Sequence, residues 1–445
     1  MKNMGSLKTN IIFKLGAIFV LIIILLIPVG LVKDLIRERE NIQNNAIEEI
    51  SDKWGGGQTI TGPYISIPYD KYVRQFSRKD STSKIVKLRD YINILPENLN
   101  INGTIAPEKR YRGIYEVVVY ESKLKISGDF QNFNLKQFDI NPNYIHLDKA
   151  VLNIGITDLK GIEKQINLKW NKESIPFNSG VNTEDLVYTG VNARVSIDLE
   201  KSDKYEFETE IDLKGSQYIY FVPVGKTTDV KLSSDWKTPS FTGAYLPDER
   251  TVDEKGFVSD WNVLHLNRNY PQAWISNRYQ IGESSFGTDL LLPVDNYKKS
   301  NRVAKYAILF VVLTFLVFFF VEVLNKVFIH PIQYLLVGIA LVVFYSLLLA
   351  FSEHMLFNLS YILSSILTLS LVTAYTSAIL KSKKVALMIF GILLTLYLFI
   401  FTIIQLEDYA LLIGSVGVFV ILSIVMYFSR KIDWYQIKLG EEIDL

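Results

Sequence analysis

The sequence predicts an α-helical membrane bundle of six spans and a large β-rich extracytoplasmic domain that is β-sandwich-like. Three observations predict this fold class. The apolar residues of the 445-residue chain gather at the N-terminus and in the last third. Between these regions, short runs rich in aromatic and β-branched residues partly alternate with polar positions. With six spans, most Lys and Arg residues next to the apolar segments fall on the same side of the membrane.

Composition narrows the class of protein. Apolar residues make up 49% of the chain, charged residues 21%, and the formal net charge is +1. These values differ from the low hydrophobicity and high net charge of disordered chains. The near-zero charge argues against a nucleic-acid partner, which would need an excess of basic residues. The absence of cysteine excludes disulfides, thiolate metal sites and cysteine nucleophiles.

The first apolar segment runs from Leu15 to Val32 without a charge. A membrane span needs about 20 mostly apolar residues, so this segment is long enough. Lys14 at its inner edge is expected to snorkel, and Pro28 lies near its outer end. A cleaved signal peptide is the alternative, but no small-x-small cleavage pattern follows the segment. The sequence therefore favours an uncleaved anchor.

Five further apolar segments follow residue 300 and are joined by very short connections. Such closely joined spans predict one helical bundle. The predicted spans are Tyr306–Leu324, Pro331–Ser352, Met355–Leu380, Val385–Leu406 and Tyr409–Ser429.

Positive residues in the short loops predict the orientation. With six spans, Lys14, Lys326, Lys384 and Arg430 all lie on one side, which is therefore cytoplasmic. A basic group at 298–305 conflicts with this, but it ends a long translocated segment, where the rule is weak. Both termini are therefore expected in the cytoplasm. The predicted parts are 1–33 (cytoplasmic N-terminus and anchor), 34–302 (external β-rich domain with an N-terminal stalk helix), 303–430 (five-helix bundle) and 431–445 (cytoplasmic tail).

The external domain begins with a helical pattern. Leu35, Ile42, Ala46 and Ile50 recur at helical spacing, and Gly55–Gly57 ends the pattern. Alternating runs then predict short strands, which suggest one β-sandwich or two stacked ones. Runs at 141–143 and 178–182 are the linker candidates. The clearest strand predictions are Tyr64–Tyr69, Tyr115–Tyr120, Lys123–Ser127 and Tyr205–Ile211.

Residues that could carry chemistry are scarce. No His has a second ligand at a metal-binding spacing, and no cofactor is expected. Glu353 and His354 either form a polar cap on the third span, which is favoured, or make a proton or ion site at the membrane edge. Glu322 is expected to pair with Lys326, four residues on in the same helix.

The segment from Ser233 to Leu290 is dense in aromatic and polar residues. It contains three of the six tryptophans, including Trp236 and Trp274, together with Arg268. Aromatic and Arg side chains can form a binding face. They also make a well-packed β core, which the sequence favours. Trp261–Arg268 alternates like a strand.

The same region carries motifs that resemble the CreD family of inner-membrane proteins. The matching motifs are Ser234-Asp235-Trp236, Pro239-Ser240-Phe241-x-Gly243, Asn267-Arg268-x-x-Pro271-Gln272-x-Trp274, Pro293-Val294-Asp295-x-Tyr297, Lys305–Phe310, Leu313-Thr314-Phe315, His330–Gly338, Ser352-Glu353-His354, Gly62-Pro63-x-x-x-x-Pro68-Tyr69 and Arg112-Gly113-Ile114-Tyr115. The resemblance covers nearly the whole chain. It implies a multi-pass protein of the inner membrane of Gram-negative bacteria, with a periplasmic domain. It also implies a role in envelope integrity and in a response that a sensor-kinase system controls. It supplies no catalytic residues.

Three functional hypotheses remain open. The first is a non-enzymatic protein that supports envelope integrity or the stress response, with the lipid bilayer and an unidentified envelope component as partners. The second is a transporter or flippase that uses the C-terminal bundle. The third is a membrane enzyme acting on lipid or wall precursors near Glu353 and His354. The first is favoured, because no acid–base pair, nucleophile or metal cluster can be assembled from the sequence.

Overall fold

The computed structural model describes two compact units. The described residues are 11–77, 82–131, 133–199, 202, 204–290, 292, 296–325, 327–406 and 409–430. Unit 1 is helical and comprises the chain up to Gln43 and from Val294 onward, and unit 2 is Asn44–Pro293. The motif residues Pro293-Val294-Asp295 and the predicted loop charges Lys326, Glu407 and Asp408 lie outside the described residues.

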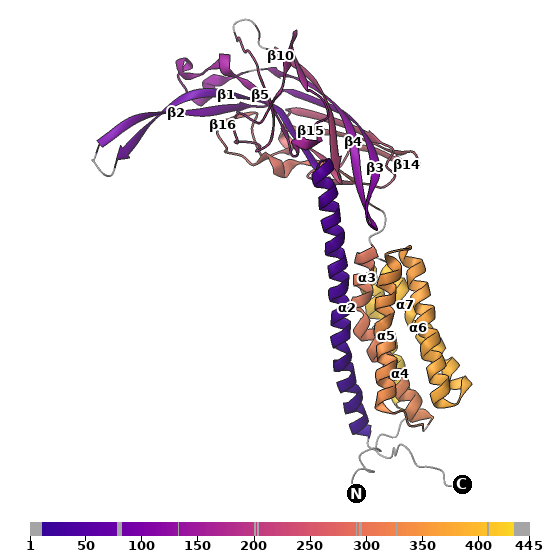
Figure 1. Ribbon diagram of the computed structural model, residues 1–445. Coiled ribbons are helices and arrows are strands. Elements are labelled where there is room, and N and C mark those ends of the chain that lie inside the picture. The colour runs from indigo at the N-terminus through magenta and orange to yellow at the C-terminus, as the bar shows by residue number, and fades with distance from the viewer. Residues whose placement is uncertain are drawn as a thin grey trace, which may run out of the picture. The chain divides into compact units, whose positions relative to one another are not determined.

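Six helices are long and apolar enough to cross a membrane, as the sequence predicted. A short helix, α3 (Asn296–Lys305), precedes the C-terminal five, and Figure 1 shows the members of this unit side by side. The six are α2 (Ile11–Trp54), α4 (Ala307–Leu324), α5 (Pro331–Ser352), α6 (Phe357–Leu380), α7 (Lys383–Gln405) and α8 (Ala410–Ser429). Each C-terminal helix begins and ends within two residues of its predicted bounds, because apolar length is a local signal.

The first helix packs against the C-terminal bundle within unit 1. Leu25 of α2 is 1% exposed and lies against Gly338 of α5. A Cβ at position 338 would come within 2.2 Å of the end of the Leu25 side chain, so a larger residue would require that side chain to move. Helix α6 instead buries a row of hydroxyl residues, which is typical of helix contacts in membranes: Ser360, Ser364, Ser365, Thr368 and Thr376.

The start of α5 shows how the sequence sets a helix boundary. Pro331 occupies the first turn, where its missing N–H costs nothing. The Nδ1 atom of His330 accepts a hydrogen bond from the Ile332 N–H (3.3 Å), and the Gln333 side chain accepts one from the His330 N–H (2.9 Å). His330 is therefore a helix cap.

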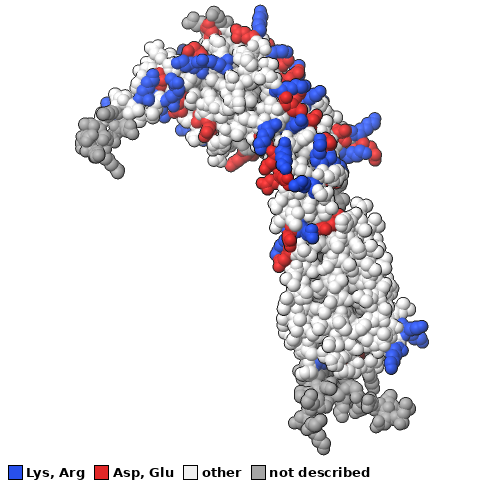
Figure 2. Space-filling model, in the orientation of Figure 1, with Lys and Arg blue, Asp and Glu red and all other residues white. Residues whose placement is uncertain are grey.

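Charge divides the two units. Figure 2 shows Lys, Arg, Asp and Glu spread over unit 2, whereas the visible face of unit 1 is almost entirely uncharged apart from its ends. Large exposed apolar side chains occur along the helices of unit 1, among them Phe19, Ile366 and Phe419. A broad exposed apolar surface on helices of this length is typical of contact with lipid.

Unit 2 contains two mixed β-sheets and no closed barrel among its described strands. The first sheet has nine strands in the order β13-β17-β11-β1-β5-β9-β8, with β2 and β16 joined to it beside β1. Strand β1 pairs in parallel with β11 and antiparallel with β2 and β5. Its strands are β1 (Gln58–Ser77), β2 (Thr82–Ile94), β5 (Val151–Ile156), β8 (Asn178–Ser179), β9 (Gly190–Arg194), β11 (Tyr218–Val222), β13 (Pro239–Gly243), β16 (Ala273–Ile275) and β17 (Phe286–Leu290).

The second sheet has eight strands in the order β14-β15-β12-β3-β4-β10-β6-β7. Strands β3, β4 and β10 form its long antiparallel centre, and β12 pairs in parallel with β3. Its strands are β3 (Asn98–Arg112), β4 (Tyr115–Gln131), β6 (Asn167–Trp170), β7 (Glu173–Pro176), β10 (Lys204–Ser216), β12 (Thr227–Ser234), β14 (Glu249–Asp253) and β15 (Gly256–Leu264). Short 3₁₀ helices join the strands at Leu135–Phe138, Pro142–Tyr144, Leu147–Lys149, Leu159–Gly161, His265–Asn267 and Ile281–Ser284.

The two sheets enclose one apolar core. Trp261 of β15 meets Phe286 of β17 with ring centroids 5.6 Å apart, and the Tyr120 hydroxyl of β4 donates to the Tyr218 carbonyl of β11 (2.8 Å). Each of these contacts joins one sheet to the other. The four predicted strand runs lie within β1, β4 and β10, and the shared core confirms a sandwich-like arrangement.

Three local predictions were wrong. The strand predicted for Trp261–Arg268 ends at Leu264, because the chain turns there into a 3₁₀ helix at His265–Asn267. Neither linker candidate separates two domains. Residues 141–143 begin a 3₁₀ helix, and residues 178–182 include β8, which pairs with β9 inside unit 2.

A long hairpin formed by β1 and β2 extends beyond the rest of unit 2 (Figure 1). The two strands stay in register from the Ile65–Ile94 pair to the Ser77–Thr82 pair. Tyr72 and Ile85 on this hairpin are 49% and 68% exposed.

Candidate functional site

The sequence candidates fall into separate places. Trp236, Arg268 and Trp274 belong to unit 2, whereas Glu353 and His354 belong to unit 1. Each group is therefore described within its own unit.

Arg268 lies inside a loop of unit 2 and is only 9% exposed. Its guanidinium donates to the carbonyls of Tyr270 (2.7 Å), Val224 (3.3 Å) and Gly225 (3.3 Å), and to the side chain of Gln272. Burial lowers the pKa of this group. The acceptors are mainly backbone carbonyls, so Arg268 ties the segment at 268–272 to the loop at 224–225.

The two tryptophans differ in their surroundings. Trp274 of β16 is 3% exposed and packs edge-on against Tyr270 and Tyr279 (centroids 6.2 and 5.4 Å apart). Trp236 is half-buried, and the Lys109 ammonium lies 6.0 Å from its ring centroid. Trp274 thus contributes to the core, while Trp236 presents part of its ring at the surface.

Glu353 joins three helices of unit 1. It follows the end of α5, accepts a hydrogen bond from the Tyr297 hydroxyl of α3 (3.1 Å) and lies 3.6 Å from the Arg39 guanidinium of α2. Its side chain is 12% exposed, whereas His354 is exposed. The two neighbours therefore point into different surroundings, as adjacent residues at a helix end do.

A buried ion pair lies elsewhere in unit 1. Lys14 Nζ of α2 is 3.0 Å from Glu322 Oε1 of α4, with side chains 7% and 0% exposed. Tyr334 of α5 donates to Glu322 Oε2 (2.7 Å), and the backbone N–H of Ile329 donates to Oε1 (3.1 Å). Lys14 also donates to the Ile329 carbonyl and lies 4.7 Å from the Phe328 ring centroid.

This ion pair corrects one prediction. Lys14 is buried instead of snorkelling to a surface, and it pairs with Glu322 across 308 residues. The predicted pairing of Glu322 with Lys326 lies outside the described residues. A buried charge needs a partner and further hydrogen bonds to offset its lost hydration. The sequence did contain a signal: Lys14 and Glu322 are isolated opposite charges at the edges of two apolar segments.

A buried polar cluster lies on the first sheet of unit 2. Ser66 donates to Asn93 (2.8 Å), Asn153 donates to Ser66 (3.3 Å), and Asn93 donates to Asp185 (3.3 Å). The Tyr64 hydroxyl beside this cluster has no hydrogen-bond partner among the described residues. Burial, and then the Asp185 charge, raise the pKa of Tyr64 well above its usual value. Local pattern gave no hint of this cluster, because its members come from three strands and a loop that are separate in the chain.

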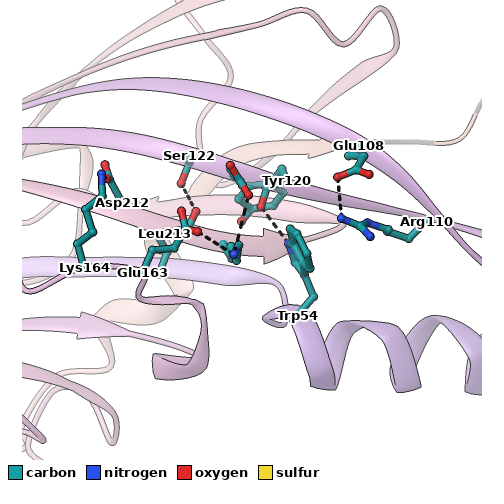
Figure 3. A network of polar contacts seen from close by, with 11 residues as sticks. Trp54, Glu108, Arg110, Tyr120, Ser122, Glu163, Lys164, Asp212 and Leu213 are labelled. Atoms are coloured by element: carbon teal, nitrogen blue, oxygen red, sulfur yellow. Dashed lines mark hydrogen bonds and ion pairs between the residues drawn. The ribbon is translucent and has the colours of Figure 1, made fainter.

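The C-terminal end of α2 is held by a polar network within unit 2 (Figure 3). The Trp54 ring lies between Arg110 and Lys214, at 4.7 and 4.6 Å from its centroid. Its indole N–H donates to the Tyr120 carbonyl (3.3 Å), and Lys214 pairs with Glu163 (2.7 Å). Two cations on one ring and a hydrogen bond fix the helix end to the second sheet.

Gly55 explains why the helix stops at this network. Its φ is +142°, a conformation that side chains rarely adopt. An added Cβ would also lie 2.9 Å from the Lys214 carbonyl oxygen. The predicted helix end at Gly55–Gly57 is confirmed.

The described residues contain no group of three or more His, Asp or Glu side chains that could hold a metal ion. His146 instead lies 2.9 Å from Asp70, and Lys87 lies 2.7 Å from the same carboxylate. The hydrogen bond from Lys87, with that from His146, lowers the pKa of Asp70 against the effect of burial. Such a cluster is typical of a structural ion pair.

The helices and sheets together define a polytopic membrane protein with one large β-sandwich-like unit between its first and second spans. The CreD family profile, described as inner membrane protein CreD, matches residues 10–435. The inner membrane protein CreD of Escherichia coli is 31% identical over 436 residues, covering 97% of this chain and 96% of that protein. The chain belongs to the CreD family and is a multi-pass inner-membrane protein.

Solved structures add nothing to this conclusion. An M1 zinc metallopeptidase from Deinococcus radiodurans covers 38% of this chain and 38% of its own, with 8% identity and a TM-score of 0.18. A substrate-bound mutant of that enzyme covers 38% and 39%, with 8% identity and a TM-score of 0.17. Similarity at this level carries no argument.

Proposed function

We propose that this protein supports the integrity of the cell envelope without catalysis, with unit 2 in the periplasm and both termini in the cytoplasm. The observation that carries the proposal is that two largely buried carboxylates of unit 1 connect helices to one another. Glu322 and Glu353 each bind side chains from two other helices of unit 1. Groups that hold helices together in this way support a scaffold, and membership of the CreD family agrees with such a role.

The orientation rests on the positive residues. Among the described residues, Lys14 lies at the start of α2, Lys381 follows α6, Lys384 lies in the first turn of α7, and Arg430 follows α8. Alternating spans bring these positions to one side of the membrane. Retention of Lys and Arg on the cytoplasmic side supports the proposed orientation.

The role of the Glu353–His354 pair tests the proposal. In cells that lack the native protein, a variant carrying Glu353→Gln and His354→Ala should still reach the membrane and protect against detergent stress. It should lose some stability, about 1 kcal/mol for each hydrogen bond removed. Complete loss of protection at normal membrane abundance would instead indicate proton-coupled or catalytic work at this loop.

Variants in unit 2 test whether protection depends on that unit and not on chemistry at Glu353 and His354. Trp274→Ala should impair protection in the same cells, because it removes a large buried ring from the core of unit 2. Quantifying the folded protein distinguishes loss of the core from loss of a binding face. Trp236→Ala is the comparison, since its ring is only half-buried.

One observation favours the transporter or flippase alternative. Thr314, Tyr345, Ser364 and Tyr397 are buried in the bundle, and their hydroxyls have no hydrogen-bond partner among the described residues. Unsatisfied hydroxyls are costly in an apolar surrounding, so a polar substrate could use them. Replacing both tyrosines by Phe should leave protection intact if the bundle is only an anchor. Loss of protection with normal folding would favour transport.

A further inference from the structure

The helical unit contains a groove whose lining includes none of the candidate site residues described above. It has a volume of about 760 Å³ and runs between α4, α7 and α8. Its lining is almost entirely aliphatic and aromatic and includes Leu316, Phe320 and Ile392. In a bilayer, hydrocarbon fills such a groove unless protein covers it.

The groove lies towards one face of the membrane-spanning region. Its lining begins at Leu313 on α4 and ends at Asn325 just after that helix. These 12 steps rise about 18 Å, about three-fifths of a hydrocarbon core about 30 Å thick. The lining also comes from the first part of α7 and the last part of α8, which lie at the same membrane face in alternating spans.

Near the bilayer centre, α7 and α8 come into close contact at one end of the groove. A Cβ on Gly417 of α8 would come within 2.0 Å of the Phe399 ring of α7, so these two helices touch there. Both residues also line the groove. Towards the membrane face the helices leave the groove between them, and no described residue of α8 is buried. The shape therefore fits one extended chain that enters from the membrane face.

A positive charge stands at the entrance. Met388, Ile392 and Phe399 line the groove from α7. Lys384 lies one turn before Met388 at a spacing of four, so it continues the same helix face beyond the apolar lining. Lys384 is exposed, and Arg430 follows α8 at the same membrane face. An acyl chain in the groove would place its headgroup beside these cations.

We propose that this groove binds one acyl chain of an anionic phospholipid, with its phosphate near Lys384. The apolar lining, a length near that of one leaflet, the helix contact at the inner end and the cation at the entrance all match that ligand. Under the proposed orientation this is the cytoplasmic leaflet. The lipid would join α8 to α4 and α7, which explains how a helix without buried residues stays with the bundle.

Native mass spectrometry of the full-length protein in mild detergent tests the acyl-chain site. The wild type should retain one phospholipid per chain. Thr395→Trp and Ile421→Trp fill the groove from α7 and α8 respectively, and each should reduce lipid retention at least several-fold. Leu398→Trp is the matched control, because Leu398 is on α7 and exposed but outside the groove. Having two groove variants on different helices keeps the test valid if one of them misfolds.

Headgroup recognition needs a second comparison. In nanodiscs that contain phosphatidylglycerol and phosphatidylcholine, the wild type should retain phosphatidylglycerol preferentially. Lys384→Ala should lower that preference several-fold, while Lys383→Ala, its exposed neighbour off the lining face, should change it less than twofold.

Four results would overturn the proposal. They are the absence of retained lipid in the wild type, equal loss in Leu398→Trp, no preference for phosphatidylglycerol, and disulfide-linked dimers of a Val420→Cys variant in membranes. The last result would mean that a second copy of the chain covers the groove.

Discussion

At the scale of single residues, the buried charges of unit 1 are the most demanding feature of this protein. Lys14 and Glu322 lie in spans far apart in the chain, yet they meet at 3.0 Å. Tyr334 and the Ile329 N–H complete the shell around the carboxylate. Removing one partner would leave the other charged and buried, which is costly.

Substitution of this pair gives a prediction with a defined magnitude. Lys14→Met or Glu322→Gln alone should destabilise the purified protein by about 3–5 kcal/mol, because each leaves a buried group without its partner. The double variant should lose less than the sum of the two single variants. Thermal unfolding in detergent measures all three, with exposed Lys383→Met as the control. Strict additivity would contradict the pairing.

A second residue-scale prediction concerns pH. Burial opposes ionisation of Asp90, but hydrogen bonds from Ser276 (2.7 Å) and the Tyr91 N–H (2.9 Å), with that from Lys71, outweigh it and lower the pKa. A lowered pKa in the folded state contributes stability above the unfolded value, about 3.9 for Asp. That contribution is lost as pH falls through the folded value.

Asp90→Asn should therefore reduce the acid sensitivity of unit 2. The free energy of unfolding should depend less steeply on pH below about 4, by at most one proton, or about 1.4 kcal/mol per pH unit. Tryptophan fluorescence measures this selectively, since five of the six tryptophans belong to unit 2. An unchanged slope would show that Asp90 has an ordinary pKa.

At the scale of elements, the end of α2 is where the long helix is fixed to unit 2. Trp54→Ala removes two cation–π contacts and one hydrogen bond, so it should destabilise unit 2 by about 2 kcal/mol. Lys53→Ala alters only an exposed pair with Glu49 and should cost less than about 0.5 kcal/mol. Denaturant unfolding followed by tryptophan fluorescence compares the two. Equal effects would mean that the Trp54 ring contributes no more than an exposed side chain.

The same scale shows what local pattern can predict. The spans and the stop at Gly55–Gly57 follow from apolar length and backbone freedom, both of which are local properties. Strand partners are not local: residues of β1 pair with residues of β11 that lie 161 positions further on, as in Gln58 with Ile219, through backbone bonds that alternation does not specify. For the same reason, spacing along one helix could not indicate Lys14 as a partner of Glu322.

At the scale of the whole molecule, the protein combines an apolar helical unit with a charged, sandwich-like β unit (Figure 2). The candidate residues Trp236, Arg268 and Trp274 were placed correctly in the β-rich region by sequence, but their contacts depend on loops brought together by the fold. Membership of the CreD family, together with the six apolar helices, shows that the protein lies in the inner membrane. The sidedness of the β unit is the claim on which the proposed function depends.

Cysteine labelling tests that sidedness most directly, because the chain has no native cysteine. Single cysteines are introduced at Ser179, an exposed position of unit 2, and at Ser382, between α6 and α7. An impermeant thiol reagent applied to intact spheroplasts should label position 179 and not position 382, while permeabilised cells should label both. Labelling of position 382 in intact spheroplasts, with protection of position 179, would contradict the account.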